Sequence, residues 1–189
     1  MIIISLLYHG TIDKYASNIV CFGVDLSKSK HYLDFGPGFY TTPNKDFAIA
    51  TAKNHARKYN AFNKEDPVTP QVLVFKCDDN LVSTLNTRSF DEADEEWAHF
   101  VIANRCENLQ IHQEYENNVN QTYDIVSGPT ADGKGTITPI VEQINSGTMT
   151  MEEVNYSDIA PASSNDWGEQ VCFHTQEALS CIELYKILR

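Results

Sequence analysis

The chain has 189 residues and a formal net charge of −12 at pH 7. This length suits one domain with a sizeable core, and we expect a single domain over residues 1–189. So acidic a surface would repel nucleic-acid phosphates and anionic lipids unless basic side chains gather locally.

The apolar opening MIIISLLY is too short to span a membrane, and no basic residues precede it as they would in a signal peptide. We therefore expect a buried first strand in a cytoplasmic protein without membrane association. Five cysteines, an odd number with no CxxC pair, favour reduced thiols over a disulfide framework or a zinc site. The six histidines lack metal-ligand spacing, so no metal is expected.

Periodicity, caps and turn residues predict short strands mixed with longer helices. Strands are expected at 2–8, 39–42, 71–77, 123–127, 170–175 and 182–188. Helices are expected at 11–20 with Thr11 as cap, at 44–59, 91–105 and 137–144, and after a capping box at 150–153. The polar stretches 61–70, 107–121 and 161–168 are expected to be loops, the second of them a surface insertion. Because strands and helices do not alternate strictly, the pattern predicts an α+β fold.

The segment DFGPGFYTT, residues 34–42, packs glycines, a proline and aromatics into one turn that leads into a strand. Its first three residues match the kinase DFG triplet. A kinase would also need a glycine-rich loop, a strand lysine and an HRD motif, all of which the sequence lacks. The turn therefore calls for another explanation.

Three segments offer chemistry at the ends of predicted strands. In YHGT (8–11), His9 can hydrogen-bond a ribose hydroxyl and Gly10 lets the backbone approach a flat ligand. Tyr40 can offer its ring to a planar aromatic group. The segment 167–173 brings Glu169 and Gln170 to a strand start. From the residues alone, His9 could instead be a core histidine, Tyr40 a packing aromatic and Gln170 a plain strand residue.

Five motifs in order give the chain a family resemblance. They are YHGT (8–11), DFGPGFYTT (34–42), WAHFVIANR (97–105), YDIVSGPTADG (123–133) and QVCFHT (170–175). Together they resemble an uncharacterised bacterial domain family of the ADP-ribosyltransferase superfamily, in the His-Tyr-Glu branch with diphtheria toxin and the poly-ADP-ribose polymerases. The resemblance covers residues 7–184. It implies a split, mainly antiparallel sheet core with packed helices, and NAD+ as co-substrate.

The resemblance also implies roles for single residues. His9 would hold a ribose hydroxyl of NAD+, the Gly10 backbone would clamp the nicotinamide carboxamide, and Tyr40 would stack on the nicotinamide ring. Thr11 and Phe39 flank these positions in the expected cofactor site. Arg105 would either reach the pyrophosphate or serve as a helix-end or ion-pair residue.

The family's third residue is a glutamate that stabilises the cationic sugar, and Gln170 aligns with it. A carboxylate counters developing positive charge far better than an amide does. Glu169 precedes it, but neighbouring side chains of a strand point to opposite faces unless a bulge at Gly168 re-aims one. A carboxylate could also come from elsewhere: from Asp34, Asp124 or Asp132. We expect Gln170 in the site, and Gln170→Glu to keep or raise activity.

The function that this resemblance implies is mono-ADP-ribosyl transfer from NAD+ to a macromolecular acceptor, a protein or a nucleic acid. Small bacterial transferases of this kind act as toxins or in conflict with phage, which would bring a neutralising antitoxin protein as a partner. Two alternatives stay open. One is a module that binds NAD+ or ADP-ribose without turnover, and the other is an NAD+ glycohydrolase.

Overall fold

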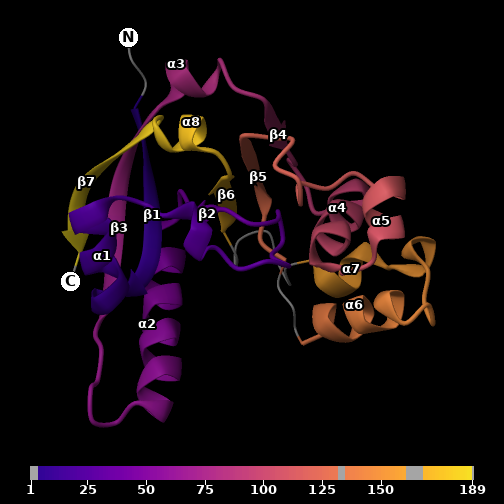
Figure 1. Ribbon diagram of the computed structural model, residues 1–189, viewed down its shortest axis with the longest axis horizontal. Coiled ribbons are helices and arrows are strands. Elements are labelled where there is room, and N and C mark those ends of the chain that lie inside the picture. Colours follow the sequence, from indigo (N-terminus) through magenta and orange to yellow (C-terminus); the bar gives the residue numbers. More distant parts are fainter. Residues whose placement is uncertain (1–3, 132–134, 161–167, 189) are drawn as a thin grey trace.

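The computed structural model describes residues 4–131, 135–160 and 168–188. Within these ranges the chain is α+β, with two mostly antiparallel sheets and eight α-helices. Figure 1 shows the two sheets lying side by side, with one group of helices beyond the second sheet. No described helix has the length and apolar character needed to cross a membrane.

The first sheet has three antiparallel strands in the order β1-β3-β7. They are β1 (Ile4–Ile12), β3 (Pro70–Asp78) and β7 (Ile182–Leu188). Helix α1 (Asp13–Phe22) packs Ala16 with Leu7 and Leu73, whereas α2 (Lys45–Phe62) packs Ala48 and Ala52 with Tyr8 and Val72. Because neighbouring strand residues face opposite ways, the two helices cover opposite faces of this sheet.

The second sheet has the order β2-β6-β5-β4, with β4 and β5 parallel and the other pairs antiparallel. Its strands are β2 (Phe39–Thr41), β6 (Glu169–Phe173), β5 (Ile125–Pro129) and β4 (Thr87–Ser89). One isolated antiparallel bridge, Tyr8 to Thr42, joins β1 to the end of β2. The two sheets therefore meet at β2 (Figure 1).

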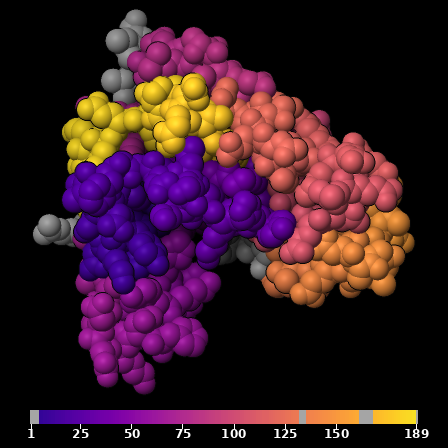
Figure 2. Space-filling model, in the orientation of Figure 1, coloured from indigo at the N-terminus to yellow at the C-terminus, as the bar shows by residue number. Residues whose placement is uncertain are grey.

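The main core lies beside the second sheet. Helix α4 (Glu95–Arg105) buries Trp97, Phe100 and Val101 against Val126 and Cys172 of that sheet. The shorter helices around it are α5 (Leu109–Glu114), α6 (Ile137–Asn145) and α7 (Tyr156–Ile159). Figure 2 shows this salmon-to-orange part of the chain gathered on one side, opposite the indigo N-terminal and yellow C-terminal segments. The remaining α-helices are α3 (Asp79–Val82) and α8 (Gln176–Leu179), each of a single turn.

Several predicted elements are confirmed, and several boundaries are wrong. The helix predicted at 44–59 is α2, and the Asn44 side chain caps it by accepting from the backbone N–H groups of Asp46 and Phe47. Thr11, however, is a buried residue of β1, which runs on to Ile12, so it caps no helix. Because β1 stays paired with β3 as far as Ile12, strand pairing outweighs the local cap signal.

The stretch 107–121 is more ordered than its polar composition predicts. It contains α5 and the fully buried Asn118, whose side chain donates to the Tyr123 carbonyl and accepts from the Tyr123 N–H. The predicted capping box at 150–153 leads into a 3₁₀ turn, Met151–Glu153, before α7. Asp132 and the segment 161–167 lie outside the described residues.

Candidate functional site

The three predicted site segments come together where β1 of the first sheet meets the end of β2 of the second sheet. Tyr8 and Thr42 exchange backbone hydrogen bonds of 2.8 and 2.9 Å, which hold β1 against the end of β2. The Thr42 hydroxyl then donates to the Glu169 carbonyl at 2.7 Å, which holds the start of β6 to the same point. Segments far apart along the chain are thus brought together at one junction.

His9 follows this bridge on β1, and its tautomer is determined by its partner. Its Nδ1 lies 2.7 Å from the Tyr40 carbonyl oxygen. A carbonyl can only accept, so Nδ1 carries the proton and Nε2 is an acceptor. Burial lowers the pKa of His9 from 6.5 to about 4, and the hydrogen bond to Tyr40 opposes this only in part. The imidazole is therefore neutral at pH 7 and can accept a hydrogen bond from a ligand hydroxyl at Nε2.

Gly10 is required by packing. A Cβ atom at this position would lie 2.1 Å from the Ala48 carbonyl oxygen of α2. Its backbone has a second property. The N–H and C=O of Tyr8 point to Thr42, and alternate residues of a strand point their backbone groups the same way. The N–H and C=O of Gly10 are therefore directed away from β3, toward the junction.

Tyr40 is held at its hydroxyl by two hydrogen bonds. Its hydroxyl donates to the Gly36 carbonyl at 2.7 Å and accepts from the Phe35 N–H at 3.0 Å. In the β2–β6 register Tyr40 lies opposite Cys172, so its side chain shares a face with Cys172 and with Gln170. Burial, with Cys172 and Asp34 nearby, raises the pKa of the Tyr40 phenol well above 10. The ring is thus uncharged and oriented, and it is half-buried against the core around α4.

Gln170 and Glu169 point to different environments. Gln170 is buried, and its Nε2 donates to the Asp34 carboxylate at 2.9 Å and to the Pro129 carbonyl at 3.3 Å. Glu169 is exposed. The β5–β6 register runs from Pro129–Glu169 to Ile125–Phe173 without a shift, so no bulge within β6 re-aims Glu169. Gln170 is therefore the member of this pair on the Tyr40 face.

Asp34 and Arg105 form a largely buried ion pair beside Gln170. The Arg105 guanidinium approaches Asp34 Oδ1 from Nε at 2.7 Å and from Nη2 at 2.5 Å. The other oxygen, Oδ2, accepts from the Ala131 N–H at 3.2 Å in addition to Gln170. Of the two roles predicted for Arg105, the structure shows the ion pair, with Asp34 as its partner. Asp124, another candidate carboxylate, bonds the Asn86 N–H and the Thr175 hydroxyl instead.

The turn 34–38 fastens these parts to β6. The Pro37 carbonyl accepts from His174 Nδ1 at 2.7 Å, and a Cβ at Gly38 would lie 2.4 Å from Cys172 Sγ. Burial lowers the pKa of His174 to about 4, so it serves as a neutral hydrogen-bond partner. The DFGPG turn therefore positions Asp34 beside Gln170, and its backbone at Phe35 and Gly36 binds the Tyr40 hydroxyl.

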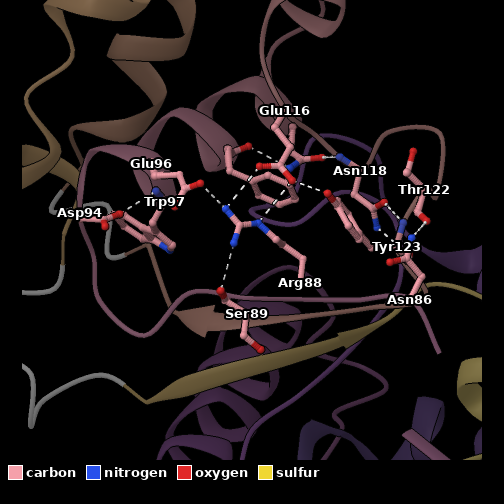
Figure 3. A network of polar contacts seen from close by, with 12 residues as sticks. Asn86, Arg88, Ser89, Asp94, Glu96, Trp97, Glu116, Asn118, Thr122 and Tyr123 are labelled. Atoms are coloured by element: carbon pink, nitrogen blue, oxygen red, sulfur yellow. Dashed lines mark hydrogen bonds and ion pairs between the residues drawn. The ribbon is translucent and has the colours of Figure 1, made fainter. Parts of the chain in front are cut away.

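A second polar network, around Arg88, belongs to the helical side of the molecule (Figure 3). Arg88 on β4 pairs with Glu96 at 2.5 Å and with Glu116 at 3.3 Å, and it lies 4.3 Å from the Phe90 ring centre. The Tyr123 hydroxyl donates to Glu116. This network ties β4 to the start of α4 and to the loop after α5. No sequence pattern indicates it, because three-residue β4 is too short to be recognised from periodicity.

Two hollows lie on α2, outside the His9–Tyr40–Gln170 cluster. The larger, of about 660 Å³, is bounded by α2 and the ends of β3 and β7, with Lys45, Ile49, Val72 and Leu188 in its lining. The other lies along α2 from Phe47 to Arg57. Across the described ranges, no three His, Cys, Asp or Glu side chains gather as a metal site would require.

Comparison with known proteins gives one match. A family described as "Protein of unknown function (DUF3990)" matches residues 5–184. No curated protein and no solved structure matches the chain.

Proposed function

The chain belongs to the DUF3990 family of unknown function, and from the geometry of its own junction we propose that it binds NAD+ and transfers ADP-ribose to a macromolecular acceptor. The observation that carries the proposal is the convergence of three segments beside β2: His9, whose ring packs on Phe39, bonds the Tyr40 carbonyl from Nδ1, and the Tyr40 and Gln170 side chains share one face of the second sheet. Those are the three positions that the resemblance to His-Tyr-Glu ADP-ribosyltransferases assigns to NAD+.

Each group has chemistry that suits its assigned role. The Gly10 backbone offers one donor and one acceptor, as a carboxamide needs. Tyr40 offers a fixed, neutral ring for the nicotinamide. His9 Nε2 is an acceptor for a ribose hydroxyl, because its Nδ1 proton is committed to Tyr40. Gln170 Oε1 is a second acceptor, because its Nε2 is committed to Asp34 and Pro129.

In the proposed reaction the bond between ribose C1′ and the nicotinamide nitrogen breaks. Its electron pair goes to the ring nitrogen, and neutral nicotinamide leaves. An acceptor nucleophile then bonds C1′ and gives up its proton. The sugar is cationic in between, so oriented acceptor oxygens stabilise it. Gln170 Oε1 supplies a partial negative charge in place of a full one.

A second candidate is a module that binds NAD+ or ADP-ribose without turnover. It is favoured by the absence of an unpaired carboxylate among the described residues of the cluster: Asp34 is paired with Arg105, and Glu169 is exposed on the other face. Hydrolysis of NAD+, with water as acceptor, follows from the same site. The proposal also includes a macromolecular acceptor, a protein or a nucleic acid, and a neutralising antitoxin protein as partner.

Nicotinamide release tests the proposal. Wild-type protein is incubated with NAD+, with and without cell lysate, and nicotinamide is quantified by chromatography. Mass spectrometry of the lysate detects added ADP-ribose. Transfer predicts release together with modified macromolecules, whereas hydrolysis predicts release alone. Calorimetric binding of NAD+ without any release would establish the binding module and end the enzyme proposal.

A further inference from the structure

We infer that the amide at position 170 is required by its surroundings, and that Asp34 is the positioning residue that turns its oxygen toward the ligand. The catalytic consequence rests on the proposed function. The structural part, the need for a donor at position 170, stands without it.

The orientation of the Gln170 amide follows from its two partners. Asp34 Oδ2 and the Pro129 carbonyl oxygen are both acceptors, at 2.9 and 3.3 Å from the same Gln170 nitrogen. An NH₂ group, with its two hydrogens, satisfies both. The amide oxygen therefore points the other way, and no described residue donates to it.

Arg105 holds Asp34 in this position by binding the carboxylate oxygen that does not contact Gln170. Both of its contacts are to Asp34 Oδ1, so Oδ2 is left for the Ala131 N–H and for Gln170. Asp34 is only 6% exposed, and water is largely excluded from it. The second oxygen of this buried carboxylate already accepts one N–H. The group beside it should therefore be a neutral hydrogen-bond donor and not another anion.

A glutamate side chain at position 170 would break this match. Its carboxylate would place an acceptor where Nε2 now lies, beside Asp34 Oδ2 and the Pro129 carbonyl. Two carboxylates this close cannot both ionise without a large cost, so the pair would hold a proton or the new side chain would turn away. The contacts therefore point to the opposite of the sequence-based expectation: Gln170→Glu lowers stability and activity instead of keeping or raising them.

The test uses Gln170→Glu, Asp34→Asn and the double variant, with Gln143→Glu as the matched control on an exposed position of α6. Thermal unfolding is followed from about pH 5 to about pH 8. If the introduced carboxyl has a pKa raised above its unfolded value, the folded state binds the proton more tightly than the unfolded chain does. The stability deficit of Gln170→Glu relative to wild type should therefore grow as pH rises and shrink toward pH 5.

The double variant should recover part of the deficit near neutral pH. An asparagine amide at position 34 can donate to the introduced carboxylate while its oxygen still faces Arg105. The inference is overturned if Gln170→Glu matches wild type across the range, if its deficit does not change with pH, or if the double variant gains nothing. The control should show no pH-dependent deficit.

Nicotinamide release separates this inference from the proposed function. If the function holds, Gln170→Glu should lose at least about tenfold in release rate, with the loss smaller at low pH. If wild type neither binds NAD+ nor releases nicotinamide, the proposed function fails, and the unfolding data still decide whether Asp34 requires a donor at position 170.

Discussion

His9 donates from Nδ1 to the main-chain oxygen of Tyr40 across 2.7 Å, which links β1 to β2 just beyond the Tyr8–Thr42 bridge. The link does two things at once. It closes the junction of the two sheets, and it leaves Nε2 as the ring nitrogen that can meet a ligand. The two ring nitrogens can therefore be tested apart.

His9→Asn separates them. The asparagine amide can take the place of Nδ1 and keep the bond to Tyr40, but it has no counterpart of Nε2. We expect a folded variant with NAD+ affinity lowered by about 1 kcal/mol, the size of one net hydrogen bond. Calorimetry measures it, with His31→Asn on an exposed loop position as the control. Unchanged affinity would remove His9 Nε2 from the site.

Stability should fall in mild acid because of two histidines. Burial lowers the pKa of both His9 and His174 to about 4 from 6.5, and buried His174 Nε2 has no hydrogen-bond partner among the described atoms. Below pH 6.5 the unfolded chain takes up these protons first, so unfolding becomes easier until the folded pKa is reached. Each histidine should cost about 2–3 kcal/mol between pH 7 and pH 4.

Urea denaturation at several pH values measures this loss. His9→Asn should remove the contribution of His9, so that the free energy of unfolding depends less steeply on pH. His31→Asn should leave this pH dependence unchanged. A wild-type protein equally stable at pH 7 and at about pH 4.5 would contradict the burial of these two rings.

Two substitutions at Tyr40 should affect different properties. Tyr40→Phe leaves the Phe35 N–H and the Gly36 carbonyl without their partner, at a cost of about 1–2 kcal/mol in stability, yet it keeps the ring. Tyr40→Ala also removes the ring, and NAD+ binding should weaken by about 1–2 kcal/mol. Urea denaturation and calorimetry follow the two effects, with exposed Tyr185→Phe as the control. Equal NAD+ affinity in wild type and a folded Tyr40→Ala would exclude stacking.

Gly10→Ala tests the packing of α2 on β1. The added carbon would lie 2.1 Å from the Ala48 carbonyl oxygen, and a helix backbone cannot move aside as a side chain can. We expect a loss of more than about 3 kcal/mol in the free energy of unfolding. Ser5→Ala, at an exposed position of the same strand, should cost far less. A Gly10→Ala protein as stable as wild type would show that α2 does not approach β1 this closely.

The sequence predicts elements better than it predicts their partners. The alanines at 48, 52 and 56 and the capping residue Asn44 are local signals, and α2 follows them. Strand β4, only Thr87–Ser89, has too few residues for any periodicity, and it exists because β5 pairs with it. Thr11 shows the reverse case, where strand pairing replaces a cap that the local sequence favours.

The candidate site is predictable as motifs and not as contacts. His9, Tyr40 and Gln170 each occupy a distinctive segment near the end of a predicted strand, so the sequence alone points to them, although in the structure His9 lies within β1. The bond between Asp34 and Gln170 joins positions 136 apart, and no local pattern specifies it. In the sequence Asp34 is one of three aspartates that could supply a carboxylate, with nothing to distinguish it. Only tertiary structure shows that its carboxylate orients the Gln170 amide.

A crystal structure of the protein with NAD+ tests the central claim most directly. We predict the nicotinamide on the Tyr40 ring with its carboxamide on the Gly10 backbone. We also predict ribose hydroxyls within hydrogen-bond distance of His9 Nε2 and Gln170 Oε1, with Glu169 pointing away. NAD+ bound elsewhere, or a ribose held by Glu169 while Gln170 stays apart from it, would contradict this assignment.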